Sequence, residues 1–188
     1  MFLIEKFDLI VFDFDGVFTD NGVTLSEIGE ESVRCSRADG LGINMLKRHI
    51  KRNGFTCKLL VLSTEINPVV SKRCEKLGLD YVQGIGNKKQ YLVEYFAQKN
   101  QRSSTPWDKI LYLGNDLNDL QVMELSQSFA PIDAHPRIKS VATKVFDERG
   151  GEGFVRAAIE FLLQVEKMTT EELSELIFDC RNWDQPQW

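Results

Sequence analysis

Runs of apolar residues that alternate with helical patterns are the feature that most constrains the fold of this chain. Leu9–Phe12, Leu59–Leu62 and Ile110–Leu113 are apolar throughout, which is typical of strands buried on both faces of a parallel sheet. Strands are expected near 7–13, 57–62, 79–83, 109–113, 127–130 and 143–146, and helices near 41–52, 67–77, 88–99, 117–125 and 151–166. This alternation predicts a Rossmann-like α/β fold, with a mostly parallel sheet and helices on both faces.

The stretch from 16 to 34 departs from this alternation. Asn21-Gly22 is a strong turn signal, and residues 23–25 and 32–34 can supply two strands, so we expect a β-hairpin flap there. Residues 63 to 114 leave room only for a helix, a short strand and a helix. The sequence therefore predicts one domain over residues 1–167 with no large cap. Residues 168–188 are expected to form a tail with a short helix starting near Thr169–Glu172 and an end that is either disordered or packed on a neighbouring subunit.

The composition argues against several classes of protein. The chain has 188 residues, 43% of them hydrophobic, but no apolar run long enough to cross a membrane. No basic region precedes an apolar stretch near residue 1, so we expect no signal peptide and a cytoplasmic protein. The net charge of −5 and the scattered basic residues argue against a nucleic-acid partner. The four cysteines show no CxxC spacing, and the two histidines suit neither a zinc site nor a catalytic triad.

Two acids, Asp13 and Asp15, directly follow the first apolar run. They would lie at the carboxyl end of a parallel strand, where open α/β sheets place their ligand site. Acids two residues apart on an extended strand point the same way, and their repulsion is costly without a cation between them. Mg²⁺ fits this need, because it binds one or two carboxylates together with waters and phosphate oxygens. Acid pairs also occur in turns and at exposed strand ends.

Further polar residues fall at the ends of the other strands or at helix starts. They are Ser63 and Thr64 after the second run, Lys88 after Gly84 and Gly86, and Asn115, Asp116 and Asp119 after the third run. Gly16, next to Asp15, would let backbone N–H groups approach a phosphate closely. Ser63 could instead cap the helix that Asn67-Pro68 introduces. Lys88 could be a solvated surface lysine, which is the interpretation favoured for Lys89.

This order of acid pair, hydroxyl, lysine and acidic loop resembles the haloacid dehalogenase superfamily of phosphotransferases. The resemblance implies that Asp13 is the nucleophile and Asp15 the general acid/base. It implies phosphate contacts from Gly16, Ser63, Thr64 and Lys88, and a Mg²⁺ site formed by Asp13, Asp15 and the loop Asn115-Asp116, supported by Asp119. Many members have Asp where Asn115 stands, so either Asn115 or Asp116 contacts the ion directly.

A narrower resemblance is to the small uncapped phosphatases of 3-deoxy-octulosonate 8-phosphate and of nonulosonate 9-phosphates, and to the C-terminal domain of some acylneuraminate cytidylyltransferases. It rests on Gly29-Glu30-Glu31, Asp39-Gly40-Leu41-Gly42-Ile43, Gln83-Gly84, Asp133-Ala134-His135-Pro136, and Gly150-Gly151-Glu152-Gly153 followed by Arg156. It implies a homotetramer in which the flap of one subunit lies near the site of the next. Asp39 and Arg156 are candidate substrate contacts, Arg156 because Arg matches a carboxylate bidentately. The alternative is that Arg156 is a helix surface residue.

Two departures bear on the substrate. Ala38 stands where the octulosonate enzymes typically carry Arg, and the run Ser63-Thr64-Glu65 followed by Asn67-Pro68 is more similar to the acylneuraminate relatives. We therefore favour a nonulosonate 9-phosphate, with octulosonate 8-phosphate as the alternative. A third interpretation is a catalytically silent oligomerisation domain associated with a cytidylyltransferase, against which the complete set of catalytic residues argues. A phosphomutase would need a cap that excludes water.

Overall fold

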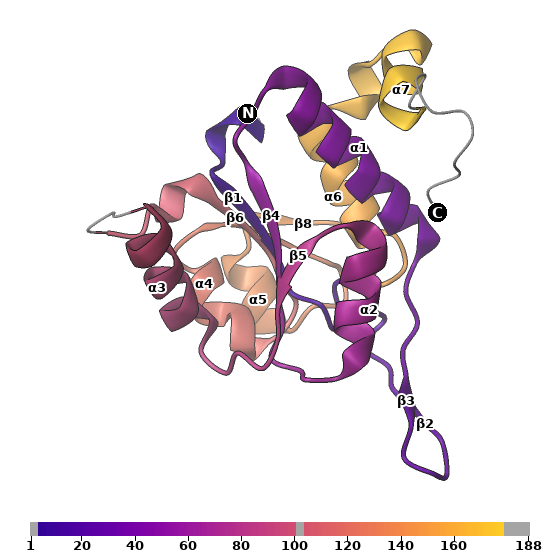
Figure 1. Cartoon of the computed structure of the whole chain (residues 1–188), viewed down its shortest axis with the longest axis vertical. Coiled ribbons are helices and arrows are strands. Elements are labelled where there is room, and N and C mark those ends of the chain that lie inside the picture. The colour runs from indigo at the N-terminus through magenta and orange to yellow at the C-terminus, as the bar shows by residue number, and fades with distance from the viewer. Residues whose placement is uncertain (1–3, 101–103, 179–188) are drawn as a thin grey trace.

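The six-stranded sheet confirms the α/β prediction. The computed structural model describes residues 4–100 and 104–178 (Figure 1). The strands are β1 (Leu9–Phe12), β4 (Lys58–Leu62), β5 (Asp80–Val82), β6 (Ile110–Leu113), β7 (Gln127–Ala130) and β8 (Lys144–Val145), in the order β5-β4-β1-β6-β7-β8. All neighbours in this sheet pair in parallel. Their carboxyl ends therefore meet at one edge, with β1 between β4 and β6, as in doubly wound folds that bind ligands at this edge.

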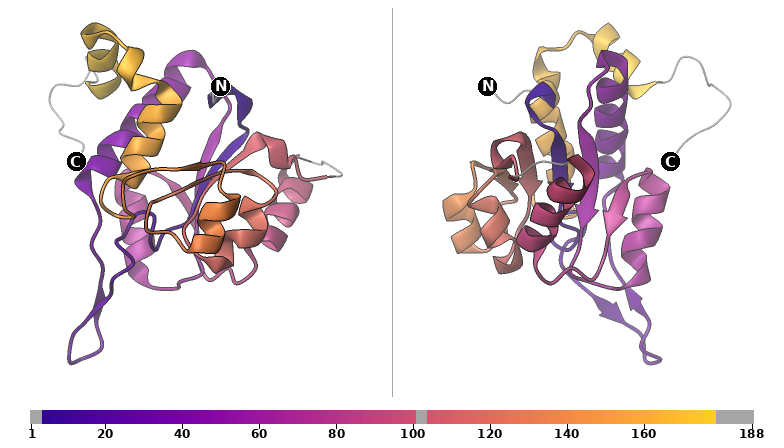
Figure 2. Two further views of the ribbon diagram at one scale, coloured as in Figure 1. Left: turned by 180° about the vertical axis from the view of Figure 1, so that it is seen from behind. Right: turned by 60° about the vertical axis from the view of Figure 1, so that its left-hand side comes forward.

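Helices cover both faces of the sheet, as expected for parallel strands. One face is covered by α1 (Arg37–Asn53), α2 (Pro68–Leu77), α6 (Phe154–Leu163) and α7 (Thr170–Ile177), and the other by α3 (Lys88–Asn100), α4 (Leu120–Met123) and α5 (Pro136–Val141) (Figures 1 and 2). Short 3₁₀ turns are η1 (Ile4–Lys6), η2 (Trp107–Lys109), η3 (Leu117–Asp119) and η4 (Val165–Lys167). Along β1, the side chains of Ile10 and Phe12 pack in the core on one face of the sheet, and those of Leu9 and Val11 pack in the core on the other face. Every residue of this strand is therefore apolar.

Helix boundaries follow from local capping. Helix α1 begins at Arg37 rather than near residue 41, because the Ser36 hydroxyl accepts a hydrogen bond from the Ala38 N–H at 3.1 Å. Helix α2 is capped by Asn67, whose side chain accepts from the Val69 N–H at 3.0 Å, with Pro68 in the first turn. The alternative interpretation of Ser63 as the helix cap is therefore wrong.

Two helical regions differ from the expectation. The predicted helix over 117–125 divides into η3 and α4, and the one over 151–166 becomes α6 and η4 after a glycine-rich turn. The six-residue α5, with Pro136 in its first turn, was not predicted. So short a helix has less than two turns and leaves no readable period.

The flap is a hairpin, as predicted, but its turn lies elsewhere. β2 (Thr24–Leu25) pairs antiparallel with β3 (Glu31–Ser32). The turn spans residues 26–30 and is closed by a hydrogen bond from the Gly29 N–H to the Ser26 carbonyl. Placing the turn at Asn21-Gly22 was wrong, because there the N–H groups are held by the Thr19 hydroxyl and the Asp20 carboxylate. The flap projects away from the rest of the molecule (Figure 2).

Two glycines let the C-terminal half of the chain pack against the loop after β1. A Cβ on Gly150 would lie 2.0 Å from the Gly16 carbonyl oxygen, and one on Gly151 would lie 2.3 Å from the Asp20 nitrogen. The Gly151 N–H donates to the Val17 carbonyl at 3.0 Å. The sequence Gly150-Gly151 thus permits a backbone contact that any side chain would prevent.

The first part of the tail packs on its own chain. In α7, Leu176 is buried, and the Arg48 guanidinium of α1 donates to the Leu176 carbonyl at 2.8 Å and to the Ile177 carbonyl. The expected disordered or intersubunit end, Trp183–Trp188, lies outside the described residues. Among the described helices, none is long and apolar enough to cross a membrane.

Candidate active site

Asp13 lies where the sequence predicted, directly after β1 at the carboxyl edge of the sheet. Its side chain is only 4% exposed. The Asp13 N–H continues the ladder by donating to the Leu113 carbonyl at 2.9 Å, and the Asp13 carboxylate accepts from the Phe14 N–H at 2.8 Å. The strand therefore fixes both the position and the direction of this carboxylate.

Lys88 joins Asp13 to the loop after β6. The Lys88 Nζ lies 2.7 Å from an oxygen of Asp13 and 2.7 Å from Oδ1 of Asp119, and the lysine is 1% exposed. Asp119 also accepts hydrogen bonds from the Asn115 N–H at 3.0 Å, the Asp116 N–H at 3.3 Å and the Tyr112 hydroxyl at 2.7 Å. The interpretation of Lys88 as a surface lysine is therefore wrong.

The net effect of burial and of the excess of carboxylates over ammonium groups is to raise the pKa values of Asp13 and Lys88. Burial raises the pKa of Asp13 to about 8, with a further increase from the Asp119 carboxylate that Lys88 only partly offsets. Burial lowers the pKa of the Lys88 ammonium, but the Asp13 and Asp119 carboxylates outweigh it, so this pKa lies above the usual value. The two results agree, because one ammonium serves two buried carboxylates and leaves one negative charge in excess.

Asp15 is half-buried and sits beside a second acidic group. Burial raises the pKa of the Asp15 carboxyl, and the nearby Glu65 carboxylate raises it further. The Thr19 hydroxyl donates to Asp15 at 3.4 Å, which favours the ionised form and moderates the rise. Both carboxyls of the pair line the cavity, and Asp15 is the more exposed of the two.

Asn115 offers an unused ligand atom to a cation. It is buried, and among the described residues its Oδ1 finds no hydrogen-bond partner. A Cβ on Gly16 would lie 1.9 Å from the Asn115 Nδ2, so Gly16 allows this amide to approach the loop after β1. An orphaned carbonyl oxygen beside a cluster with excess negative charge fits a hard divalent cation. Asp116 is exposed, and its carboxylate accepts from the Leu117 N–H at 2.7 Å.

The described residues hold no ready-made cluster of three His, Cys, Asp or Glu side chains around a common point. The set that does converge contains Asp13, Asp15 and the Asn115 amide. A site with few protein ligands suits Mg²⁺, which keeps several waters and takes oxygens from a bound phosphate.

A cavity of about 380 Å³ opens above these residues. It is lined by Asp13, Asp15, Asn21, Val23, Glu31, Val33, Thr64, Glu65, Asn67, Val69, Val70, Asn115, Asp116, Leu117 and Asn118. Five of these are carboxylic acids, and none of the described lining residues is Lys or Arg. The cavity brings β1, the start of α2, the loop after β6 and the flap together, so its wall is acidic.

The two hydroxyl residues after β4 differ in position. Thr64 lines the cavity, and its hydroxyl accepts from the Asn118 amide at 3.0 Å. Ser63 is buried behind the wall, where its hydroxyl accepts from the Glu65 N–H at 3.0 Å. Asn118, Glu31 and Tyr112 were missed as site residues; the only sequence signal was the hydroxyl of Tyr112 inside an otherwise apolar strand, which needs a partner when buried.

Asp39 and Arg156 meet each other rather than the cavity. The buried Asp39 carboxylate of α1 accepts from the Arg156 N–H at 2.9 Å and so caps the first turn of α6. The Arg156 guanidinium lies 2.7 Å from Glu160, one turn further along α6. Neither residue lines the cavity described above, and their contact with substrate stays a prediction.

Comparison with known proteins gives relatives over most of the chain. No family model matches the sequence. The 3-deoxy-D-manno-octulosonate 8-phosphate phosphatase of Escherichia coli K12 is 31% identical over 163 residues, which cover 85% of this chain and 80% of that protein. The N-acylneuraminate cytidylyltransferase A of Danio rerio is 26% identical over 173 residues, 91% of this chain but 38% of that protein.

Solved structures share the fold. A Streptomyces avermitilis protein assigned to the haloacid dehalogenase hydrolases superposes with a TM-score of 0.78 and 32% identity, over 90% of this chain and 94% of that one. The cobalt-bound deoxy-D-mannose-octulosonate 8-phosphate phosphatase of Haemophilus influenzae superposes with a TM-score of 0.76 and 25% identity, over 90% and 98%.

The fold and the site define a phosphatase whose carboxylate pair ends the central strand of an α/β sheet. The chain belongs to the haloacid dehalogenase superfamily, within its uncapped subfamily similar to octulosonate 8-phosphate phosphatases. The prediction of the family is thereby confirmed.

The raised pKa of Asp13 leads to a prediction for stability without metal. Between the ordinary value of 3.8 and about 8, the folded protein retains a proton that the unfolded chain has released, so the free energy of unfolding falls as pH rises through this window. Asp13→Asn lacks this group, so its stability relative to the parent protein is expected to increase from about pH 5 to about pH 9. Urea unfolding in a chelator measures both curves. An equal difference at both pH values would contradict the prediction.

Proposed function

We propose that the chain is a Mg²⁺-dependent phosphatase that hydrolyses the terminal phosphate of a phosphorylated ulosonic acid through an aspartyl phosphate on Asp13. The observation that carries the proposal is the placement of Asp13: it directly follows β1, is buried, and has the Lys88 ammonium 2.7 Å away. A carboxylate attacks phosphorus only where its repulsion from the phosphoryl oxygens is reduced. Lys88 supplies part of that compensating charge.

The two carboxylates divide the chemistry. An Asp13 oxygen forms a bond to phosphorus while the ester P–O bond breaks, and the leaving alkoxide takes a proton from Asp15. Asp15, now ionised, removes a proton from water as the water attacks the phosphorus, which frees Asp13 and phosphate. The raised pKa of Asp15 supports its role, because a carboxyl that keeps its proton closer to neutral pH is a better general acid.

Mg²⁺ would be held by Asp13, Asp15 and the Asn115 carbonyl, with Asp119 fixing the loop and Asp116 as the alternative ligand. The orphaned Asn115 Oδ1 and the exposed, capping Asp116 favour Asn115. When bound, the ion would neutralise charge that develops on the phosphoryl oxygens. Gly16, Ser63, Thr64 and Lys88 would contact the phosphate. A divalent metal requirement is consistent with the cobalt-bound Haemophilus structure.

We favour a nonulosonate 9-phosphate as the substrate. The Danio relative supports this choice because the substrate in its name, an N-acylneuraminate, is a nonulosonate. In addition, Glu65 of the run Ser63-Thr64-Glu65 lines the cavity. The Escherichia coli relative supports octulosonate 8-phosphate, which is the second candidate. A silent oligomerisation domain is disfavoured, because its residues would have no reason to retain a buried nucleophile paired with Lys88.

A screen of phosphorylated sugar acids tests the function. With Mg²⁺ present, the protein is expected to release phosphate from a nonulosonate 9-phosphate with a higher kcat/KM than from an octulosonate 8-phosphate or from simple hexose phosphates. Asp13→Asn serves as the control and should release none, because an amide cannot form the phospho-enzyme. A preference for octulosonate 8-phosphate would reverse the assignment of the sugar. The absence of release from every ester, or full release by Asp13→Asn, would reject the phosphatase mechanism.

The acid role of Asp15 can be separated from a metal role by the leaving group. Asp15→Asn is expected to lower kcat on a sugar phosphate by more than about 100-fold, since general acid/base catalysis contributes at least that much. An aryl phosphate needs little protonation of its leaving group, so the first step should suffer less. Burst kinetics on both esters measures this step. Equal losses on the two esters would indicate that Asp15 acts only through the metal.

We further propose that the active form is a homotetramer in which a neighbouring subunit completes the site. An acidic cavity without a lining Lys or Arg among the described residues is a poor site for a sugar acid unless cations come from elsewhere. The flap supplies exposed apolar area for such a contact: Val23, Leu25 and Ile28 are 55%, 64% and 76% exposed. A two-stranded hairpin is marginal alone and gains from a partner surface.

Dilution tests the shared site. Activity towards the sugar-acid phosphate is expected to fall when the protein is diluted to the point where sedimentation shows monomers. Leu25→Asp combined with Ile28→Asp should shift dissociation to higher protein concentration, because it places charges in the apolar contact. Lys89→Asp on the exposed face of α3 is the matched control. A monomer with undiminished activity would refute the proposal.

A further inference from the structure

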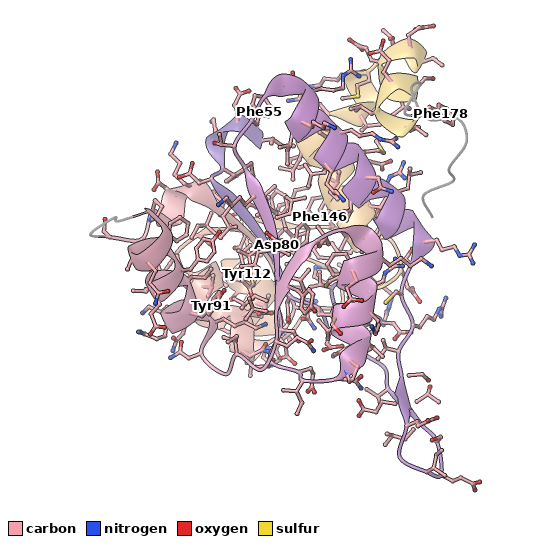
Figure 3. The ribbon with its side chains drawn as sticks, viewed as in Figure 1. Phe55, Asp80, Tyr91, Tyr112, Phe146 and Phe178 are labelled. Carbon is pink, nitrogen blue, oxygen red and sulfur yellow. The ribbon has the colours of Figure 1, made fainter. Side chains whose placement is uncertain are left out.

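Tyr112 is a fully buried tyrosine in the middle of an apolar strand. It lies on β6, and its ring enters the core covered by α3, α4 and α5 (Figure 3). Its neighbours along the strand are Ile110, Leu111 and Leu113. A phenylalanine would fill the same volume without a polar atom, whereas a buried hydroxyl is unfavourable unless it has a partner.

The partner of the hydroxyl is the carboxylate that also holds Lys88. The Tyr112 hydroxyl donates to Asp119 Oδ1 at 2.7 Å, and the Lys88 Nζ lies 2.7 Å from the same oxygen. The other oxygen, Oδ2, accepts from the Asn115 and Asp116 N–H groups. Asp119 is therefore held by four donors, and Tyr112 is the one among these four that takes no part in the proposed phosphate or metal contacts.

The backbone leaves room for this contact. A Cβ on Gly114 would lie 2.6 Å from Asp119 Oδ2 and 2.8 Å from the Tyr112 ring. Gly114 thus allows the ring and the carboxylate to meet at the end of β6. The contact therefore depends on the missing side chain of Gly114 and on the hydroxyl of Tyr112.

We propose that Tyr112 is a positioning residue for the reaction: its hydroxyl fixes Asp119, so that Lys88 is shared evenly between Asp119 and Asp13. Without the hydroxyl, Asp119 Oδ1 has Lys88 as its one remaining donor and draws the ammonium away from the nucleophile. A charged acceptor makes this hydrogen bond stronger than a neutral one. The inference rests on the proposed mechanism at Asp13 but not on the identity of the sugar.

The test is Tyr112→Phe assayed on an aryl phosphate, a probe that reports the phosphatase reaction whichever sugar acid is the natural substrate. We expect kcat to fall about tenfold, in line with the loss of one hydrogen bond to a charged group, while KM changes less than about twofold. Tyr91→Phe is the matched control, because Tyr91 lies on α3 one turn after Lys88 and faces a different cavity (Figure 3). Its kcat should equal that of the parent protein.

A double-mutant cycle on unfolding free energy tests the contact itself. The effects of Tyr112→Phe and Asp119→Ala are expected to be non-additive, since either change removes the hydrogen bond between the Tyr112 hydroxyl and Asp119. This measurement does not require an active variant. Additive effects, or a kcat of Tyr112→Phe equal to that of the parent, would overturn the proposal. An inactive parent protein would instead reject the phosphatase mechanism, while the cycle would still decide whether Tyr112 holds Asp119.

Discussion

The shared ammonium of Lys88 is the interaction on which the rest of the site depends. Lys88 begins α3, Asp13 directly follows β1 and Asp119 ends η3, so one side chain joins three segments that are distant in the sequence. Among the side chains whose burial the structure describes, it is the only basic one that is buried. Removing one partner of a buried pair leaves an uncompensated charge and typically costs about 3–5 kcal/mol. The cluster therefore fixes the register of the helix and the loop relative to the central strand.

The charges of the same cluster do not balance, because its carboxylates outnumber its ammonium groups. Two buried carboxylates face one ammonium, and the cavity adds four more acids without a lining Lys or Arg among the described residues: Asp15, Glu31, Glu65 and Asp116. A fold selected for stability alone would avoid this imbalance, whereas a site that takes a divalent ion and a phosphate requires it. Burial raises the pKa values of Asp13 and Asp15, and the neighbouring carboxylates Asp119 and Glu65 raise them further.

Sequence reasoning found the parts of the structure that local patterns encode. The apolar runs located the strands, and the rule that parallel strands end at one edge placed Asp13, Thr64 and Asn115 near one another. It missed what depends on contacts across the fold: Asn118 reaches Thr64 across 54 positions of sequence. The hairpin turn was misplaced because the Asn21 and Gly22 N–H groups donate locally to the Thr19 hydroxyl and the Asp20 carboxylate. Asp39 was a substrate candidate through the resemblance; in the structure its carboxylate accepts from the Arg156 N–H in the first turn of α6, and its contact with substrate stays a prediction.

In the proposed mechanism, the lack of a cap domain among the described residues would determine which reaction an aspartyl phosphate undergoes. A phosphomutase must keep water from the intermediate until a second sugar hydroxyl attacks, and the described residues that line the cavity come from the loops after β1, β4 and β6, the start of α2 and the flap. The flap is tied to α2 by one hydrogen bond from the Asn67 amide to Glu31, too little to seal the site against solvent. In the proposed mechanism, water would then be the nucleophile that attacks the phosphorus, with Asp15 as its base. Hydrolysis follows from the open architecture as much as from the residues themselves, and selectivity among esters must come from whatever covers the open side.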